Sequence, residues 1–194
     1  MKGFVINCKN STERLRLFCE NKFPFDIEVF EAIEGKTPSE RDYISGISHL
    51  TIMNKQKEFP FLVCEDDCIL LQLWDIVDRA IDQLPEDWDA LWLGATLQSP
   101  ITRYSENLYR LKNGHALHAV IYNSPAMIDY MTRNFTPDKY RCLDVLTAYS
   151  AQKLFNCYIT YPICATQRSC MSDINGKFLD NYNIIVDSYN KYAR

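Results

Sequence analysis

The stretch "FPFLVCEDDCILL" (residues 59–71) runs from apolar residues into three adjacent carboxylates and then returns to apolar residues. Residues 61–64 form a continuous apolar run of the length that a buried strand has. The carboxylates of Glu65, Asp66 and Asp67 repel one another, so packing alone does not select such a turn between two apolar flanks. The stretch therefore predicts a buried strand that ends in a functional acidic turn, although a plain solvated turn explains the triplet by itself equally well.

Strand-like and helix-like segments alternate on both sides of this stretch. The strand-like segments are "GFVIN" (3–7), "DIEVFEAI" (26–33), "DALWLGA" (89–95), "HAVIYN" (118–123) and "CYITYP" (157–162). The helix-like segments are residues 10–23, a helix capped by Ser39, and residues 71–85, 126–135 and 142–155, while residues 179–194 fit a helix or a strand. This order predicts one α/β domain over residues 1–194, with a Rossmann-like, mainly parallel central sheet and helices on both faces.

Composition narrows the classes of function. The 194 residues are 47% apolar, 13% aromatic and 24% charged, with a net charge of -4, which suits a globular domain with a sizeable core. No segment concentrates Lys and Arg as a nucleic-acid binder does, so we expect no nucleic-acid partner. No window reaches the roughly 18 apolar residues of a transmembrane helix, and no signal peptide is evident, so we expect a cytoplasmic protein with no transmembrane segment. The eight cysteines include no CxxC pair, which favours reduced thiols over a zinc site.

The acidic turn lies where an open α/β sheet binds its ligands. Such sheets place ligands in the crevice outside the carboxyl ends of their strands. Asn7 ends the first predicted strand, and the triplet at 65–67 ends the third. Oxygen-rich clusters suit Mg²⁺ or Mn²⁺, and a divalent cation in such a crevice would favour a polyphosphate ligand.

Seven segments, taken in order and spacing, resemble glycosyltransferase family 25, the lipopolysaccharide and collagen galactosyltransferase-like group. They extend over about residues 3–174 and are "FVINCKNSTERLRLF", "FEAIEGK", "ISHL", "FPFLVCEDDCIL", "DALWLGA", "HAVIYN" and "ITYPICATQRSCMSDI". The resemblance implies a GT-A fold, in which one α/β domain binds a nucleotide sugar and a DxD-like motif holds a divalent cation on its diphosphate. The triplet at 65–67 matches that motif.

The resemblance also implies roles for single residues. Asp67 would ligate Mn²⁺ or Mg²⁺, and His118, in the family's "HA", would complete the metal shell, although a strand histidine is often structural. Ser48 and His49 match the family's "SH". The residues on the side of the nucleotide sugar would be Asn7, Arg14, Glu65, Asp66 and Asp67. For Arg14 the alternative is an exposed helix residue.

An inverting transfer, which the resemblance suggests, needs a base for the acceptor hydroxyl. Asp144, in "RCLDVL", is the first candidate, and its alternative role is a favourable charge at a helix N-terminus. Asp173, in "CMSDI", is the second candidate, and its alternative role is in a turn. The C-terminal segment from residue 165 to 178 offers no histidine, so the third protein ligand of the metal stays open.

The sequence thus predicts a metal-dependent glycosyltransferase that moves a hexose from a nucleotide sugar, by family analogy a UDP-sugar, to a saccharide or hydroxyl acceptor. Its acceptor could hold it peripherally at a membrane. One alternative is a catalytically silent nucleotide- or carbohydrate-binding module on the same fold. Another is a metal-dependent phosphohydrolase or nucleotidyltransferase, which needs a second acidic cluster. The candidates for that cluster, Glu86, Asp87 and Asp89, stand at the entry end of a strand, where a solvated turn is the simpler interpretation.

Overall fold

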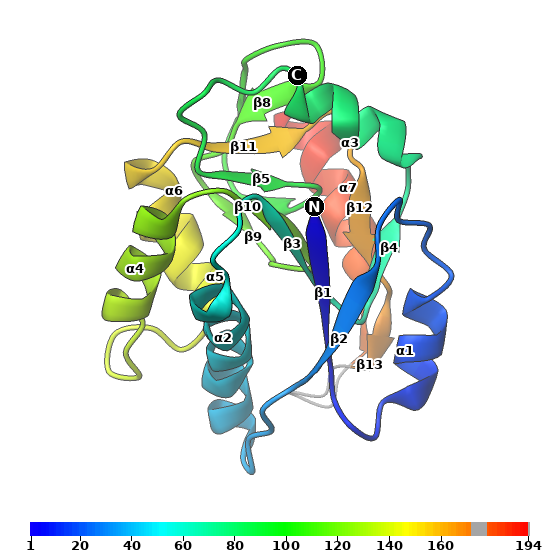
Figure 1. Ribbon diagram of the computed structural model, residues 1–194, viewed down its shortest axis with the longest axis vertical. Helices are drawn as coiled ribbons and strands as arrows, with labels where there is room; N and C mark the ends of the chain where they lie inside the picture. The colour runs from blue at the N-terminus through cyan, green and yellow to red at the C-terminus, as the bar shows by residue number, and fades with distance from the viewer. Residues whose placement is uncertain (172–177, 194) are drawn as a thin grey trace.

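The computed structural model describes residues 1–171 and 178–193, and it has one large sheet surrounded by helices (Figure 1). The sheet has eight strands in the order β2-β1-β3-β10-β5-β11-β8-β7. In chain order these are β1 (Lys2–Asn7), β2 (Ile27–Glu31), β3 (Phe61–Glu65), β5 (Ala90–Trp92), β7 (Thr102–Arg103), β8 (Leu108–Arg110), β10 (Ala119–Tyr122) and β11 (Cys157–Thr160).

The sheet is mixed. β1 pairs in parallel with β2 and β3, and β11 pairs in parallel with β5. β10 lies antiparallel between β3 and β5, so those two strands run in the same direction. β8 is antiparallel to both β11 and β7. Strand direction is therefore common to all but β10 and β8, which confirms the predicted α/β architecture with a mainly parallel sheet.

Three short ribbons accompany the large sheet. They are β4 (Cys68–Leu70) with β12 (Ala165–Gln167), β6 (Thr96–Leu97) with β9 (Gly114–His115), and β13 (Cys170–Met171) with β14 (Phe178–Leu179). The helices are α1 (Thr12–Phe18), α2 (Pro38–Lys55), α3 (Trp74–Ile81), α4 (Pro125–Asn134), α5 (Leu143–Leu146), the π-helical turn η1 (Thr147–Ala151), α6 (Gln152–Leu154) and α7 (Asn181–Tyr192).

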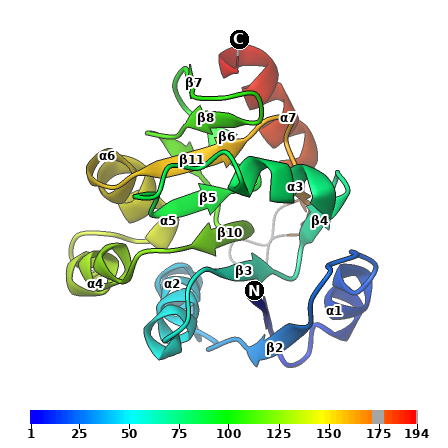
Figure 2. The ribbon, with the colours of Figure 1, turned by 45° about the horizontal axis from the view of Figure 1, so that its top comes forward.

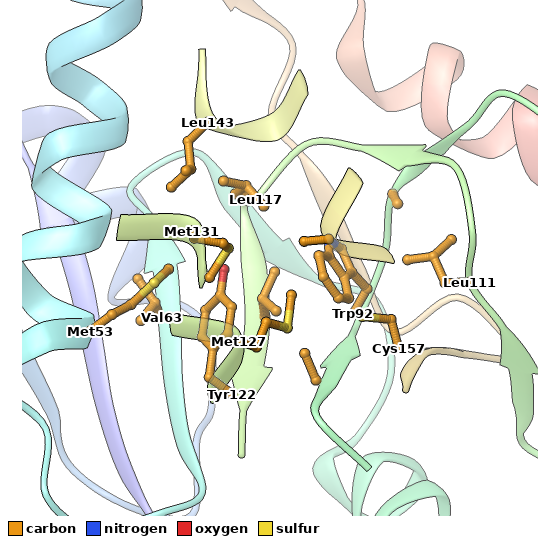
Figure 3. Packing of buried hydrophobic residues seen from close by; sticks show 14 of the residues in the cluster. Met53, Val63, Trp92, Leu111, Leu117, Tyr122, Met127, Met131, Leu143 and Cys157 are labelled. Carbon is orange, nitrogen blue, oxygen red and sulfur yellow. The ribbon is translucent and has the colours of Figure 1, made fainter. Parts of the chain in front are cut away.

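Helices cover both faces of the sheet (Figure 2). Residues 61–64 of β3 are completely buried and alternate between the faces, as a strand buried on both sides must. Phe61 and Val63 join the larger apolar cluster, against α2, α4 and α5, while Leu62 and Cys64 join the cluster under α1 and α3. Figure 3 shows the larger cluster, where Met53 of α2 and Met127 and Met131 of α4 lie around Val63 and Tyr122.

Local sequence explains where two of the helices begin. α4 starts at Ser124-Pro125 as predicted, and the Ser124 hydroxyl accepts a hydrogen bond from the Met127 amide. The predicted Ser39 cap of α2 is wrong, because the cap is Thr37, which forms a reciprocal capping box with Glu40. Within the described ranges, no helix has the length and apolar composition needed to cross a bilayer.

The path of the chain creates a switch point between β1 and β3. From β1 the chain moves outward to β2 and then returns to β3 on the other side of β1, with Ile6 level with Glu65. The crossovers on the two sides leave in opposite directions, so a crevice opens at the carboxyl ends of β1 and β3. Asn7 and the acidic turn stand at this crevice.

Candidate functional site

A cavity of about 620 Å³ lies at the carboxyl ends of β1 and β3. This volume is within the range of roughly 300–1,000 Å³ that small-molecule and cofactor sites occupy. Arg14 of α1, His49 of α2, the acidic turn and Asp144 of α5 all contribute to its lining. Two of these, Arg14 and Asp144, are 130 residues apart in sequence, and the fold brings both to the predicted acidic turn.

Asp66 is held by the protein itself. Its Oδ2 accepts a hydrogen bond of 2.7 Å from Nδ2 of Asn7, and its Oδ1 forms an ion pair with the guanidinium of Arg14. Burial raises the pKa of Asp66, while the contacts with Arg14 and Asn7 oppose this rise. Both carboxylate oxygens are thus occupied, and three of the predicted nucleotide-binding residues meet as a tether that fixes the acidic turn to β1 and α1.

We expect Arg14→Met to lower the free energy of unfolding by about 1–3 kcal/mol, because the buried Asp66 carboxylate would lose its charged partner. Arg16→Met on the same helix is the matched control, since the Arg16 side chain is 60% exposed and pairs with Glu13 at the surface. The control should change stability by less than about 0.5 kcal/mol. Urea denaturation measures both, and equal losses in the two variants would contradict the tether.

Glu65 and Asp67 approach each other across the side chain of Gln167. Nε2 of Gln167 is 3.2 Å from Oε2 of Glu65 and 3.4 Å from Oδ2 of Asp67. The other oxygen of Glu65, Oε1, is 3.1 Å from Nε2 of His49. Burial raises the pKa of Glu65, but the interactions with His49 and then with His118 outweigh burial, so the pKa of Glu65 is lowered. The contact with His49 thus favours the ionised form of this carboxylate.

Asp67 carries the least compensated charge of the turn. Burial and then repulsion by Glu65 raise its pKa to about 7, although Arg14, 3.6 Å away, favours the ionised form. The backbone position of Asp67 is fixed, because its carbonyl accepts a 2.7 Å hydrogen bond from the Arg168 amide. An additional cation near Asp67 would relieve this repulsion.

Gln167 is a site residue that the sequence did not single out. β12 pairs antiparallel with β4, and this pairing places Gln167 level with Cys68, directly after the acidic turn. The paired segments are about 100 residues apart in sequence, so no local sequence pattern predicts the pairing. The only signal was a polar residue in a segment that the family resemblance already included, "ATQRS".

His118, the predicted second metal ligand, lies behind the acidic turn. It is completely buried behind the acidic turn, where its carbonyl accepts a 3.0 Å hydrogen bond from the Glu65 amide. Burial lowers the pKa of its imidazole to about 4. It is not among the residues that line the cavity, so its role as a metal ligand stays a prediction.

The donor chemistry of the turn suits a hard cation that also binds a phosphate. In residues 1–171 and 178–193, no three His, Cys, Asp or Glu side chains are grouped as a complete metal site. Mg²⁺, however, is usually held by one or two carboxylates together with substrate phosphates and water. Glu65 and Asp67 supply carboxylates of this kind at the cavity, and burial together with repulsion by Glu65 raises the pKa of Asp67 even with Arg14 3.6 Å away. The residues present therefore fit a cation held jointly with a phosphate.

Asp144 of α5 lines the same cavity. Its Oδ2 is 3.6 Å from Nδ1 of His115. The family resemblance favours His118 over His115, but it is His115 that lies beside the candidate base. The other candidate base, Asp173, lies outside the described residues.

The second acidic group has a structural role. Asp89 accepts a hydrogen bond from the Asn156 amide at 2.6 Å, and Asp87 accepts one from the Asn156 side chain at 2.7 Å. Both stand before β5, at the end of the sheet away from the cavity. The cluster that a two-metal phosphohydrolase would need is therefore not at the site that the structure describes.

Comparison with known proteins adds a likeness of fold. No family model and no curated protein matches this sequence. The crystal structure of A197 from STIV has a TM-score of 0.51 with 13% identity, and the match covers 92% of each chain, which shows a shared fold alone. A UDP-glucose pyrophosphorylase complexed with UDP-glucose is 12% identical, with 98% of this chain and 78% of that chain covered, but its TM-score of 0.42 is too low to support an argument.

Proposed function

We propose that this chain is a metal-dependent glycosyltransferase that moves a hexose from a nucleotide sugar, with a UDP-sugar as the expected donor, to a saccharide or hydroxyl acceptor with inversion. The observation that carries the proposal is the pair of carboxylates, Glu65 and Asp67, that meet beside a cavity of nucleotide size at the switch point of an α/β sheet. Burial and repulsion by Glu65 raise the pKa of Asp67 in this cavity, although Arg14 lies 3.6 Å away. A divalent cation that arrives with a phosphate ligand would relieve this repulsion.

The donor side would be organised by the acidic turn. Asp67 would hold Mn²⁺ or Mg²⁺, which when bound would neutralise charge on the departing nucleoside diphosphate. Glu65, whose two oxygens contact His49 and Gln167, would accept hydrogen bonds from ribose hydroxyls. Asn7 and Arg14 act through Asp66, because they keep the turn against β1.

The acceptor side would be organised by α5. Asp144 lines the same cavity as the acidic turn, and in the proposed transfer it would act on an acceptor hydroxyl bound beside it. An inverting displacement requires this hydroxyl to attack from the face away from the diphosphate, since the attacking oxygen and the leaving phosphate must lie on opposite sides of the anomeric carbon. Asp144 is therefore the residue that we assign to removal of the acceptor proton.

The first test measures donor binding by the variant Asp67→Asn. We expect the Mn²⁺-dependent affinity for UDP to fall at least about tenfold, because loss of a metal ligand or of its supporting contacts typically costs about 10–100-fold in metal affinity. Isothermal titration calorimetry with UDP, in the presence and absence of Mn²⁺, gives the affinity. Circular dichroism gives the folded state.

Asp75→Asn is the control, because the Asp75 side chain is 63% exposed on α3 and pairs with Arg79 there. Its UDP affinity should equal that of the wild type. If Asp67→Asn binds UDP with unchanged Mn²⁺ dependence, the assignment of the site is wrong. If the wild type binds UDP but releases no sugar from UDP-glucose or UDP-galactose with Mn²⁺ present, the silent binding module is the better account.

A further inference from the structure

A histidine and a carboxylate form a pair beside the cavity, which Asp144 lines and which His115 adjoins through its contact with Asp144. Nδ1 of His115 is 3.6 Å from Oδ2 of Asp144, and the two side chains are 19% and 30% exposed. Part of each group is therefore accessible to a ligand. The pairing occupies Nδ1 of the imidazole, whereas no described residue forms a hydrogen bond with its Nε2.

The backbone directly after His115 has an unusual conformation. His115 ends β9, where it is level with Thr96 of β6. The next residue, Ala116, has φ of 77°, a left-handed conformation that is uncommon for a residue other than glycine. Residues held in such conformations cluster at functional sites, since the fold must maintain them at a cost. Ala116 itself lines the cavity.

The other wall of the pair is the π-helical turn η1. Its Tyr149 ring lies edge-to-face with the His115 ring at a centroid distance of 5.3 Å, which restricts the plane of the imidazole. η1 is anchored through Ser150, whose hydroxyl is 2.5 Å from that of Tyr130. Short π-helical turns are rare and occur frequently at functional sites. The contact with Asp144, the left-handed conformation of Ala116 and the Tyr149 ring of η1 thus all occur at His115.

Asp144 is suited to orient an imidazole. Burial raises its pKa, but interactions with His115 and Cys142 outweigh burial, and the pKa of Asp144 is lowered. A carboxylate that stays ionised in this way is a weak proton acceptor. Imidazole side chains as a class titrate closer to neutral pH and are the most frequent general bases.

We propose that His115 is the catalytic base of the transfer and that Asp144 is its positioning residue. The inference rests on the proposed function and refines it, because Asp144 then acts through His115. As the acceptor oxygen forms its bond to the anomeric carbon, the bond from that carbon to the diphosphate oxygen breaks and the diphosphate leaves with the electron pair. The acceptor proton passes to Nε2 of His115, and the resulting imidazolium is stabilised by the Asp144 carboxylate.

The tautomer of His115 tests the pair without any activity assay. The chain has three histidines, and the other two, His49 and His118, are buried. Long-range ¹H–¹⁵N spectra of the ¹⁵N-labelled protein, assigned with His115→Gln, should show neutral His115 with its proton on Nδ1 and a bare Nε2. Asp144→Asn should shift this tautomer equilibrium. A proton on Nε2 in the wild type, or no response to Asp144→Asn, overturns the inference.

The catalytic role is tested by His115→Gln in transfer from UDP-glucose and UDP-galactose to a panel of methyl glycosides. We expect the rate to fall about 10²-fold or more, with the Mn²⁺-dependent affinity for UDP unchanged. Lys112→Gln, an exposed change in the preceding loop, should keep the wild-type rate. Transfer at the full rate by His115→Gln overturns this inference and leaves the proposed function intact. A wild type that does not bind UDP overturns the proposed function. In that case the tautomer of His115 still tests its pairing with Asp144.

Discussion

Asp144→Asn is expected to slow sugar transfer by about 10²- to 10⁴-fold while donor binding is retained. The amide keeps the size of the carboxylate but removes the charge that stabilises an imidazolium at His115, 3.6 Å away. The contacts of Asp144 are with His115 and Cys142 rather than with Asp67, so we expect donor binding to persist in this variant. Single-turnover transfer from a UDP-sugar, with UDP affinity from calorimetry, separates the two steps.

Asp129→Asn is the control for this experiment, since Asp129 is an exposed residue of α4 paired with Arg133. It should transfer at the wild-type rate. Full transfer activity of Asp144→Asn would remove Asp144 from the mechanism. A parallel loss of UDP affinity would instead indicate that α5 shapes the donor site.

Gly94→Ala is expected to destabilise the protein by about 3 kcal/mol, the upper part of the range for overpacked positions. A Cβ at Gly94 would overlap the carbonyl oxygen of Ala165, and it would lie 2.9 Å from the carbonyl carbon of the same residue. This backbone is fixed, because the amides of Cys164 and Ala165 both donate hydrogen bonds to the Leu93 carbonyl. The crowded group is therefore main chain, which cannot turn aside as a flexible side chain would.

Chemical denaturation followed by tryptophan fluorescence measures the change in the free energy of unfolding. Gln98→Ala, an exposed change a few residues along the chain, should alter it by less than about 0.5 kcal/mol. A loss in Gly94→Ala no larger than that of Gln98→Ala would show that β12 moves freely relative to the end of β5. In that case the ribbon that carries Gln167 would not be a rigid support for the acidic turn.

The central strands and the acidic turn could be predicted from the sequence because their signals are local. The apolar run at residues 61–64 is completely buried, as its composition indicates. Asn7 and the acidic turn meet because parallel strands bring their carboxyl ends to one edge of a sheet, so predicting β1 and β3 also predicted their contact. The helical pattern of residues 142–155 placed Asp144 at the start of a helix, where the structure has it.

The remaining parts of the site depend on contacts between distant segments. Gln167 reaches Glu65 through the pairing of β12 with β4, and His115 reaches Asp144 across a ribbon of two-residue strands. Strands this short show no periodicity that a sequence could reveal. For residues 179–194 the sequence allowed either a helix or a strand. The structure has the helix α7 there, and its cap Asp180 accepts a hydrogen bond from the Asn183 amide.

Helix α2 connects the two halves of the cavity. Its His49 contacts Glu65 on one side, and its Gly46 lies so close to α5 that a Cβ there would be 2.9 Å from Cβ of Leu143 and 2.6 Å from the Phe135 ring. Glu65 and α5 thus both contact the same helix. If the proposed transfer takes place here, a sideways displacement of α2 would change the distance between leaving group and nucleophile, and that distance would depend on how closely α2 and α5 approach at Gly46.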